Sequence, residues 1–190
     1  MKKLFLFSLL LLPSSFVLAH TGHGTHFSLI EGLVHPLGWD HLLAMVAVGM
    51  WSVTTLPSNR YWLGPLVFVS VMTAAALAVQ MGISLPYTET LVAFSVVMFG
   101  AMILLGRRLA VYPGLALVAT AAIFHGQAHG VEISVGSQWT AYVIGFVLTT
   151  AALHAAGLLA GLSLRHSGER VWRFIGAALA ATGFVLLTQT

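Results

Sequence analysis

The chain of 190 residues is 58% hydrophobic and only 7% charged, with a formal net charge of +3. Soluble domains carry about 25% charged residues, so this composition excludes a soluble enzyme, a nucleic-acid-binding domain and a disordered chain. It predicts an integral membrane protein. The sequence contains no cysteine, which also excludes a disulfide framework and a thiolate metal site. Nine histidines outnumber the five acidic residues, and they are the main candidates for chemistry.

Residues 1–19 have the pattern of a secretory signal peptide. A basic start precedes an apolar run over residues 4–12, and the small residue Ala19 follows a proline break. This run is shorter than the roughly 20 residues that span a bilayer as a helix, so we expect cleavage after Ala19. An uncleaved first membrane helix is the alternative. Cleavage leaves residues 20–34 as a periplasmic, histidine-containing segment.

This exported segment begins with three histidines in seven residues, namely His20, His23 and His26. Short histidine-rich tracts bind metal ions, so these side chains are candidates for collecting a cation. A polar leader whose histidines have no role is the alternative.

Residues 35–190 are expected to form one domain, an all-α integral membrane bundle of six transmembrane helices. Six apolar runs, bounded by glycine, proline or charged residues, each approach the length of a membrane-spanning helix. They cover residues 37–55, 62–81, 87–105, 110–130, 138–163 and 171–188. The connections between them are short, so the bundle is expected to be compact and to carry no soluble domain.

The arginines predict the orientation of the bundle. The loops after the first, third and fifth runs, with their edges, contain all six of them: Arg60, Arg107, Arg108, Arg165, Arg170 and Arg173. Basic residues mark cytoplasmic loops. We therefore expect a multi-pass protein of the bacterial inner membrane, with both termini of the mature chain on the periplasmic side.

The first run opens with three candidate metal ligands, His35, Asp40 and His41. Pro36 suits the first position of a helix, which places His35 at the outer edge of the membrane. His35 and His41 lie on different faces of an ideal helix, so joint ligation requires an irregular helix start, which Gly38 permits. Otherwise Asp40 accepts a ring N–H and orients a histidine.

The fourth and fifth runs carry the other candidates. His125 and His129 are four residues apart and share a helix face, and Glu132 follows three residues later. His154 lies in the middle of the fifth run, where an ionisable side chain is costly and therefore a functional candidate. A neutral histidine bonded to a neighbouring helix is the alternative for His154. His166, in an arginine-rich loop, is expected to be a solvated surface residue.

The predicted topology places the motifs of the first and fourth runs at the same outer level, with His154 deeper in the membrane. Binding groups at successive depths are typical of an ion path. Imidazole and carboxylate ligands suit nickel, cobalt, zinc and copper alike, so the residues alone do not identify the metal.

The chain resembles the HupE/UreJ family, small nickel/cobalt permeases associated with hydrogenase and urease systems. Residues 124–132 match the motif Phe-His-Gly-x-Ala-His-Gly-x-Glu in full, and the stretches around Asp40 and His154 are also similar to the family. The resemblance covers the whole chain, from the signal peptide to the sixth span. One departure is that the spacing between His35 and Asp40 is one residue shorter than in the family pattern.

The resemblance implies that the protein is a permease and not an enzyme. The permease is expected to carry Ni²⁺, or less readily Co²⁺, into the cytoplasm, with Zn²⁺ and Cu²⁺ less favoured. The ligands implied are His35, Asp40, His41, His125, His129, Glu132 and His154. The expected partners are this ion and the bilayer, without a permanent cofactor, nucleic acid or ATP, since the sequence has no P-loop. An intramembrane metal-dependent enzyme and a metal-sensing or metal-donating membrane protein are the alternatives, and homo-oligomerisation is left open.

Overall fold

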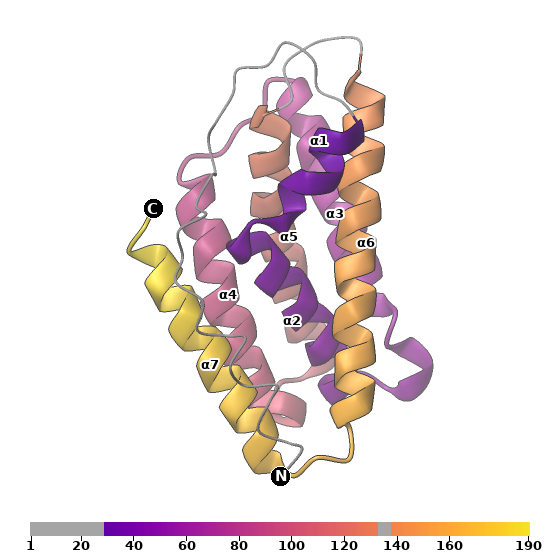
Figure 1. Cartoon of the computed structure of the whole chain (residues 1–190), viewed down its shortest axis with the longest axis vertical. Coiled ribbons are helices and arrows are strands. Elements are labelled where there is room, and N and C mark those ends of the chain that lie inside the picture. Colours follow the sequence, from indigo (N-terminus) through magenta and orange to yellow (C-terminus); the bar gives the residue numbers. More distant parts are fainter. Residues whose placement is uncertain (1–28, 133–137) are drawn as a thin grey trace.

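The computed structural model describes residues 29–132 and 138–190. Within these ranges the chain is all-α, and its long helices run side by side along the longest axis of the molecule (Figure 1). The helices are α1 (Leu29–Val34), α2 (Trp39–Thr55), α3 (Leu63–Gln80), α4 (Thr88–Leu105), α5 (Val111–Glu132), α6 (Trp139–Leu164) and α7 (Glu169–Leu187). Three 3-10 turns follow α1, α2 and α4, namely η2 (His35–Leu37), η3 (Ser58–Arg60) and η4 (Gly106–Arg108). The expected signal peptide and His20, His23 and His26 lie outside the described residues.

Each of the six apolar runs contains one long helix, from α2 to α7 in chain order. Among the described residues, four helices are long and apolar enough to cross a membrane, and a fifth span results if the bent α1–α2 pair counts as one. α5 does not meet this test because His125, Gln127 and His129 lower the hydropathy of its second half. The chain is therefore a multi-pass membrane protein, and the number of six spans stays a prediction.

The structure contains a helix that the sequence did not predict. Residues 29–34, expected in the exported segment, form α1, which packs against α6. The approach is close because Gly32 lies on the backbone carbonyl of Tyr142, where a Cβ would collide. The Thr149 hydroxyl also donates a hydrogen bond to the Leu33 carbonyl oxygen at 2.8 Å. α1 therefore belongs to the bundle.

The chain bends by 76° between the α1–η2 segment and α2. Pro36 lies in η2, not at the start of α2 as expected, and Gly38 follows with a ψ of 142°, which is outside the helical range. The chain leaves the helical path at Gly38, and α2 begins at Trp39. This bend lies partway along the bundle in Figure 1, so α2 starts partway along its length, and Gly38 and Trp39 at the bend are exposed.

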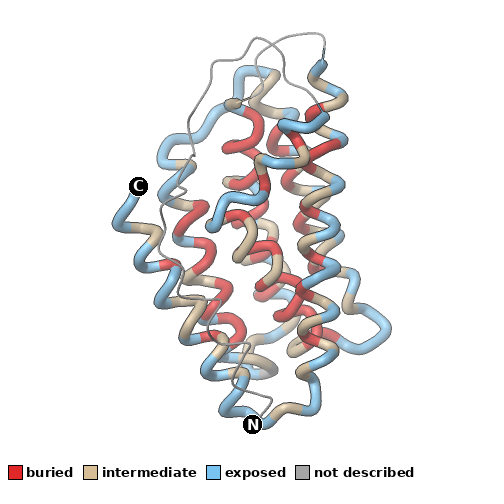
Figure 2. Tube along the Cα trace, viewed as in Figure 1, coloured by how far each residue is buried: buried red, intermediate tan, exposed pale blue. Residues whose placement is uncertain are grey.

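Glycines set the distances between the helices that carry the candidate residues. Gly126 of α5 lies against the Met72 backbone of α3, and Gly49 of α2 lies against the backbone of α6 at His154. Gly100 joins α4 to α7 in the same way. Small residues permit such contacts between membrane helices, where lipid supplies no hydrophobic drive for association. The buried residues gather on α2, α4 and α5 in the middle of the bundle, whereas α7 is mostly exposed (Figure 2).

Replacing Gly126 by alanine is expected to destabilise the protein by about 1–3 kcal/mol, because the added methyl group meets the Met72 carbonyl and overpacking strains the backbone. Gly168→Ala is the matched control, since nothing lies within 4 Å of a Cβ at that position. Thermal unfolding of both variants in detergent measures the difference. Equal melting temperatures would contradict the close packing of α3 on α5.

Candidate metal site

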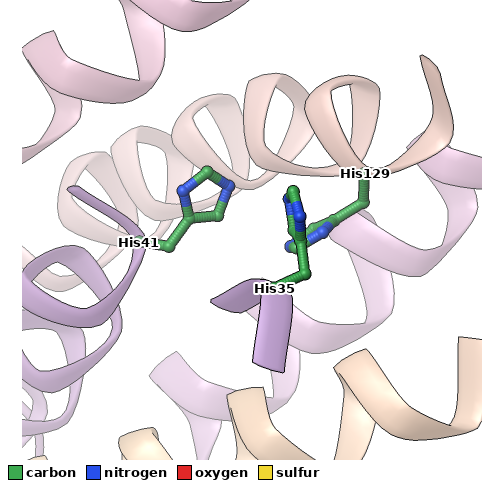
Figure 3. A group of neighbouring side chains, drawn as sticks. All are labelled: His35, His41 and His129. Atoms are coloured by element: carbon green, nitrogen blue, oxygen red, sulfur yellow. The ribbon is translucent and has the colours of Figure 1, made fainter. Parts of the chain in front are cut away.

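Three histidines from three separate elements meet where α1 and α2 join. His35 comes from η2, His41 from the first turn of α2 and His129 from the end of α5, and one ring nitrogen of each lies within 4.8 Å of the others. The ring centroids are 4.6 Å apart for His35 and His129, 5.0 Å for His41 and His129, and 5.5 Å for His35 and His41. Figure 3 shows the three rings turned toward a common centre. We call these residues the histidine cluster.

The bend at Gly38 explains why His35 and His41 meet although they are six residues apart. Six residues on a continuous helix turn through about 600° and leave the two side chains on different faces. The non-helical ψ of Gly38 redirects the chain, so that both rings face α5. The irregular helix start that joint ligation requires is therefore present, even with the shortened spacing of this motif.

Two carboxylates hold rings of the cluster. The Oδ1 atom of Asp40 lies 2.9 Å from Nδ1 of His41 and also accepts a hydrogen bond from the His41 backbone N–H at 2.8 Å. The Oε2 atom of Glu132 lies 2.7 Å from Nδ1 of His35. A carboxylate that accepts a hydrogen bond from one ring N–H leaves the other ring nitrogen with a free lone pair and fixes the ring orientation. Asp40 and Glu132 thus each contact the Nδ1 atom of one histidine in the cluster.

His129 is buried at the centre, and neither of its ring nitrogens has a hydrogen-bond partner among the described residues. Its ring stacks on Phe146 with the centroids 4.7 Å apart and the planes within 4°. Nε2 of His41 is also buried and without a partner in the described part of the chain. A buried polar atom without a partner costs about 1–3 kcal/mol, and binding of a metal ion would give these nitrogens a partner.

Two further histidines extend the cluster into the bundle. The His125 ring lies 4.7 Å from that of His41, and its Nε2 atom is 2.9 Å from the Ser95 hydroxyl. Phe68 contacts both His125 and His154, with ring centroid distances of 5.2 Å and 5.0 Å. All seven residues predicted as ligands therefore lie in one continuous region.

The His154 ring is hydrogen-bonded within its own helix, not to a neighbouring helix as in the alternative interpretation. Its Nδ1 atom donates a hydrogen bond to the Thr150 carbonyl oxygen at 2.7 Å. Nε2 then carries the lone pair, and it is buried without a partner among the described residues. His166, by contrast, is exposed and accepts a hydrogen bond from the Arg165 Nε atom at 3.0 Å, as expected of a surface residue.

Sequence reasoning did not find three residues that shape this region: Phe68, Ser95 and Phe146. Each of the three lies in an apolar run and contacts a histidine on another helix, so the sequence does not reveal the contact. Ser95 had a weak signal, because it is a hydroxyl in the apolar middle of α4. The two phenylalanines had none.

The donor set suits a divalent first-row ion. Neutral imidazole nitrogens bind Zn, Cu, Fe and Ni, whereas Mg and Ca prefer oxygen ligands. Two nitrogens that bind the same ion at about 2.1 Å are at most about 4.2 Å apart. A small inward movement of the rings from their separation of up to 4.8 Å therefore brings all three into binding distance.

The fold and the cluster define a class: a multi-pass, α-helical membrane protein with a buried group of histidines. The chain belongs to the HupE/UreJ family, whose model, described as HupE / UreJ protein, matches residues 8–186. Protein HupE of Rhizobium leguminosarum bv. viciae is 39% identical over 181 residues, which cover 94% of this chain and 93% of that protein. No solved structure matches the chain. The resemblance inferred from the motifs is confirmed, and the family consists of permease-like accessory proteins associated with nickel/cobalt transport.

Asp40→Asn is expected to weaken Ni²⁺ binding about 10–100-fold, the usual effect of losing the carboxylate that orients a histidine ligand. Asparagine keeps the size of the side chain but removes its charge. Equilibrium dialysis of the purified protein with Ni²⁺ measures the affinity, and Glu169→Gln, which removes an exposed carboxylate paired with Arg173, is the control. Equal affinities for the two variants would show that Asp40 does not support a metal ligand.

Proposed function

We propose that this protein transports a divalent transition-metal ion, nickel in preference to cobalt, across the bacterial inner membrane into the cytoplasm. The observation that carries the proposal is the row of buried histidines, each of which keeps at least one ring nitrogen without a partner among the described residues. The association of the HupE/UreJ family with nickel/cobalt transport supports the choice of metals.

The arrangement of the histidines supports stepwise movement. His35, with 24% of its side chain exposed, and Glu132, with 33%, form the accessible edge of the cluster. His41 and His129 are buried next to them, and His125 and His154 follow further along. An ion path needs sites that bind well enough to admit the ion and weakly enough to release it. Neighbouring rings about 5 Å apart permit one ligand to be exchanged for the next.

The direction of transport rests on charge. The arginine-bearing loops lie at the end of the bundle away from the cluster, and the positive-inside rule assigns that end to the cytoplasm. A divalent ion moving inward gains about 4.6 kcal/mol per 100 mV, at 2.3 kcal/mol per charge. The membrane potential is therefore a sufficient energy source for a chain without a P-loop.

The geometry supports an intramembrane metalloenzyme less well. A metal-dependent hydrolase needs a base that acts on metal-bound water, whereas Asp40 and Glu132 are both engaged with histidine rings.

The direct test is uptake of radiolabelled nickel by cells that lack their own nickel importers. The double variant His125→Ala/His129→Ala is expected to reduce uptake to background, because it removes two buried imidazoles from the path. His166→Ala, which changes an exposed histidine outside the path, is the matched control and is expected to retain uptake. Excess cobalt, zinc and copper as competitors rank the metals. Uptake at the wild-type rate by the double variant, with equal amounts of protein in the membrane, would refute the proposal.

Deleting residues 20–26 separates transport from metal sensing or donation. A permease that only collects ions with this segment should lose uptake at scarce metal and recover it at higher concentrations. Loss of uptake at every concentration would favour the alternative in which His20, His23 and His26 are the working part.

A further inference from the structure

A second region of interest is a cavity at the end of the bundle that carries the arginines. Its volume is about 690 Å³, within the range of roughly 300–1,000 Å³ that is typical of ligand sites. The ends of α2 and α4, the η4 turn and the turn between α6 and α7 form its walls. These segments lie together at the lower end of the molecule in Figure 1. No residue of the histidine cluster lines the cavity.

One part of the wall is basic. Arg108, Arg165 and Arg173 line the cavity together with a single acid, Glu169. Glu169 pairs with Arg173 at 2.7 Å, and Arg165, which has no acidic partner among the described residues, donates a hydrogen bond to the ring of His166 at 3.0 Å. Arg108 has no hydrogen-bond or ion-pair partner among the described residues. The wall therefore has an excess of positive charge, to which the amino-terminal end of α7 adds its partial charge.

The other part of the wall is apolar. Leu104 and Leu105 line the cavity with 39% and 48% of their surfaces exposed, and Ile103 and Val53 form its buried side. Trp172, half-buried, also lines it, and tryptophan is enriched at the level of lipid headgroups. A free anion would contact only the arginines. An apolar wall beside a basic one instead suits an amphiphile, and the cavity lies at the ends of apolar helices, where headgroups are found.

We propose that this cavity binds the phosphate headgroup of an anionic phospholipid, with the apolar wall against the upper part of an acyl chain. Basic cavities between membrane helices bind anionic headgroups in this way, and the planar guanidinium of arginine matches phosphate oxygens in pairs. The proposal is independent of metal transport, because the cavity and the histidine cluster share no residue.

The test is lipid retention by the purified full-length protein in detergent, measured by native mass spectrometry. Phosphatidylglycerol and phosphatidylcholine with identical acyl chains are added in equal amounts. The wild type is expected to retain phosphatidylglycerol in preference. Arg165→Gln/Arg173→Gln is expected to weaken this retention roughly 30-fold, at about fivefold for each basic residue lost. Arg108→Gln, which breaks no interaction among the described residues, is expected to weaken it about fivefold without altering the melting temperature.

The matched control is Arg60→Gln/Arg170→Gln, which removes the same charge from exposed positions outside the cavity. It is expected to weaken retention of phosphatidylglycerol much less than the cavity double variant does, since neither Arg60 nor Arg170 lines the cavity. Equal losses in the two double variants would overturn the proposal, because attraction would then come from surface charge alone. Displacement of the lipid by millimolar inorganic phosphate would also overturn it, in favour of a free-anion site. Equal retention of both lipids by the wild type would assign the cavity to another occupant, such as an acidic protein segment.

Discussion

The bend at Gly38 is the constraint on which the candidate site depends. A straight helix through residues 29–55 would separate His35 from His41 and carry α1 away from α6. Breaking a helix inside a membrane protein exposes backbone groups that lipid cannot satisfy. Here the Gly38 N–H bonds the His35 carbonyl oxygen at 3.3 Å, and Asp40 accepts the His41 N–H. Asp40 thus supports the broken backbone and the His41 ring with the same oxygen atom.

Close glycine contacts determine where the remaining imidazoles lie. His125 and His129 each precede a glycine, Gly126 and Gly130, that lies against α3. The contact of these two glycines fixes the rotation of α5 about its axis and therefore the direction of the neighbouring face that carries the histidines. His154 lies at the point where Gly49 brings α2 onto α6. A side chain at any of these glycines moves a backbone and therefore an imidazole. The positions of the ring nitrogens consequently follow from helix packing as much as from the motifs themselves.

The sequence was sufficient for features that depend on local pattern. Hydropathy located α2 to α7, and the four-residue spacing placed His125 and His129 on one face. Prediction from the sequence failed for features that depend on which helices pack against each other. α1 has only six residues, too few to distinguish it from an exported tail. Ser95 and Phe146 contact histidines of other helices, and the bond from His154 to Thr150 depends on rotamer, so no periodicity reveals them. The sequence showed that Gly38 permits the bend that brings His35 and His41 together. It did not show that the chain adopts this bend.

The distribution of acids along the proposed path gives it a direction. At the accessible edge, Glu132 and Asp40 each contact a histidine of the cluster, and their negative charge offsets that of a divalent ion leaving water. Deeper in the bundle the support is neutral, since His125 bonds the Ser95 hydroxyl and His154 a backbone carbonyl. If the proposed transport takes place, a divalent ion would be held most strongly where it enters and less strongly at the later histidines. Such a gradient would meet both requirements of an ion path, which are binding that admits scarce metal at the entrance and weaker binding that releases it further in.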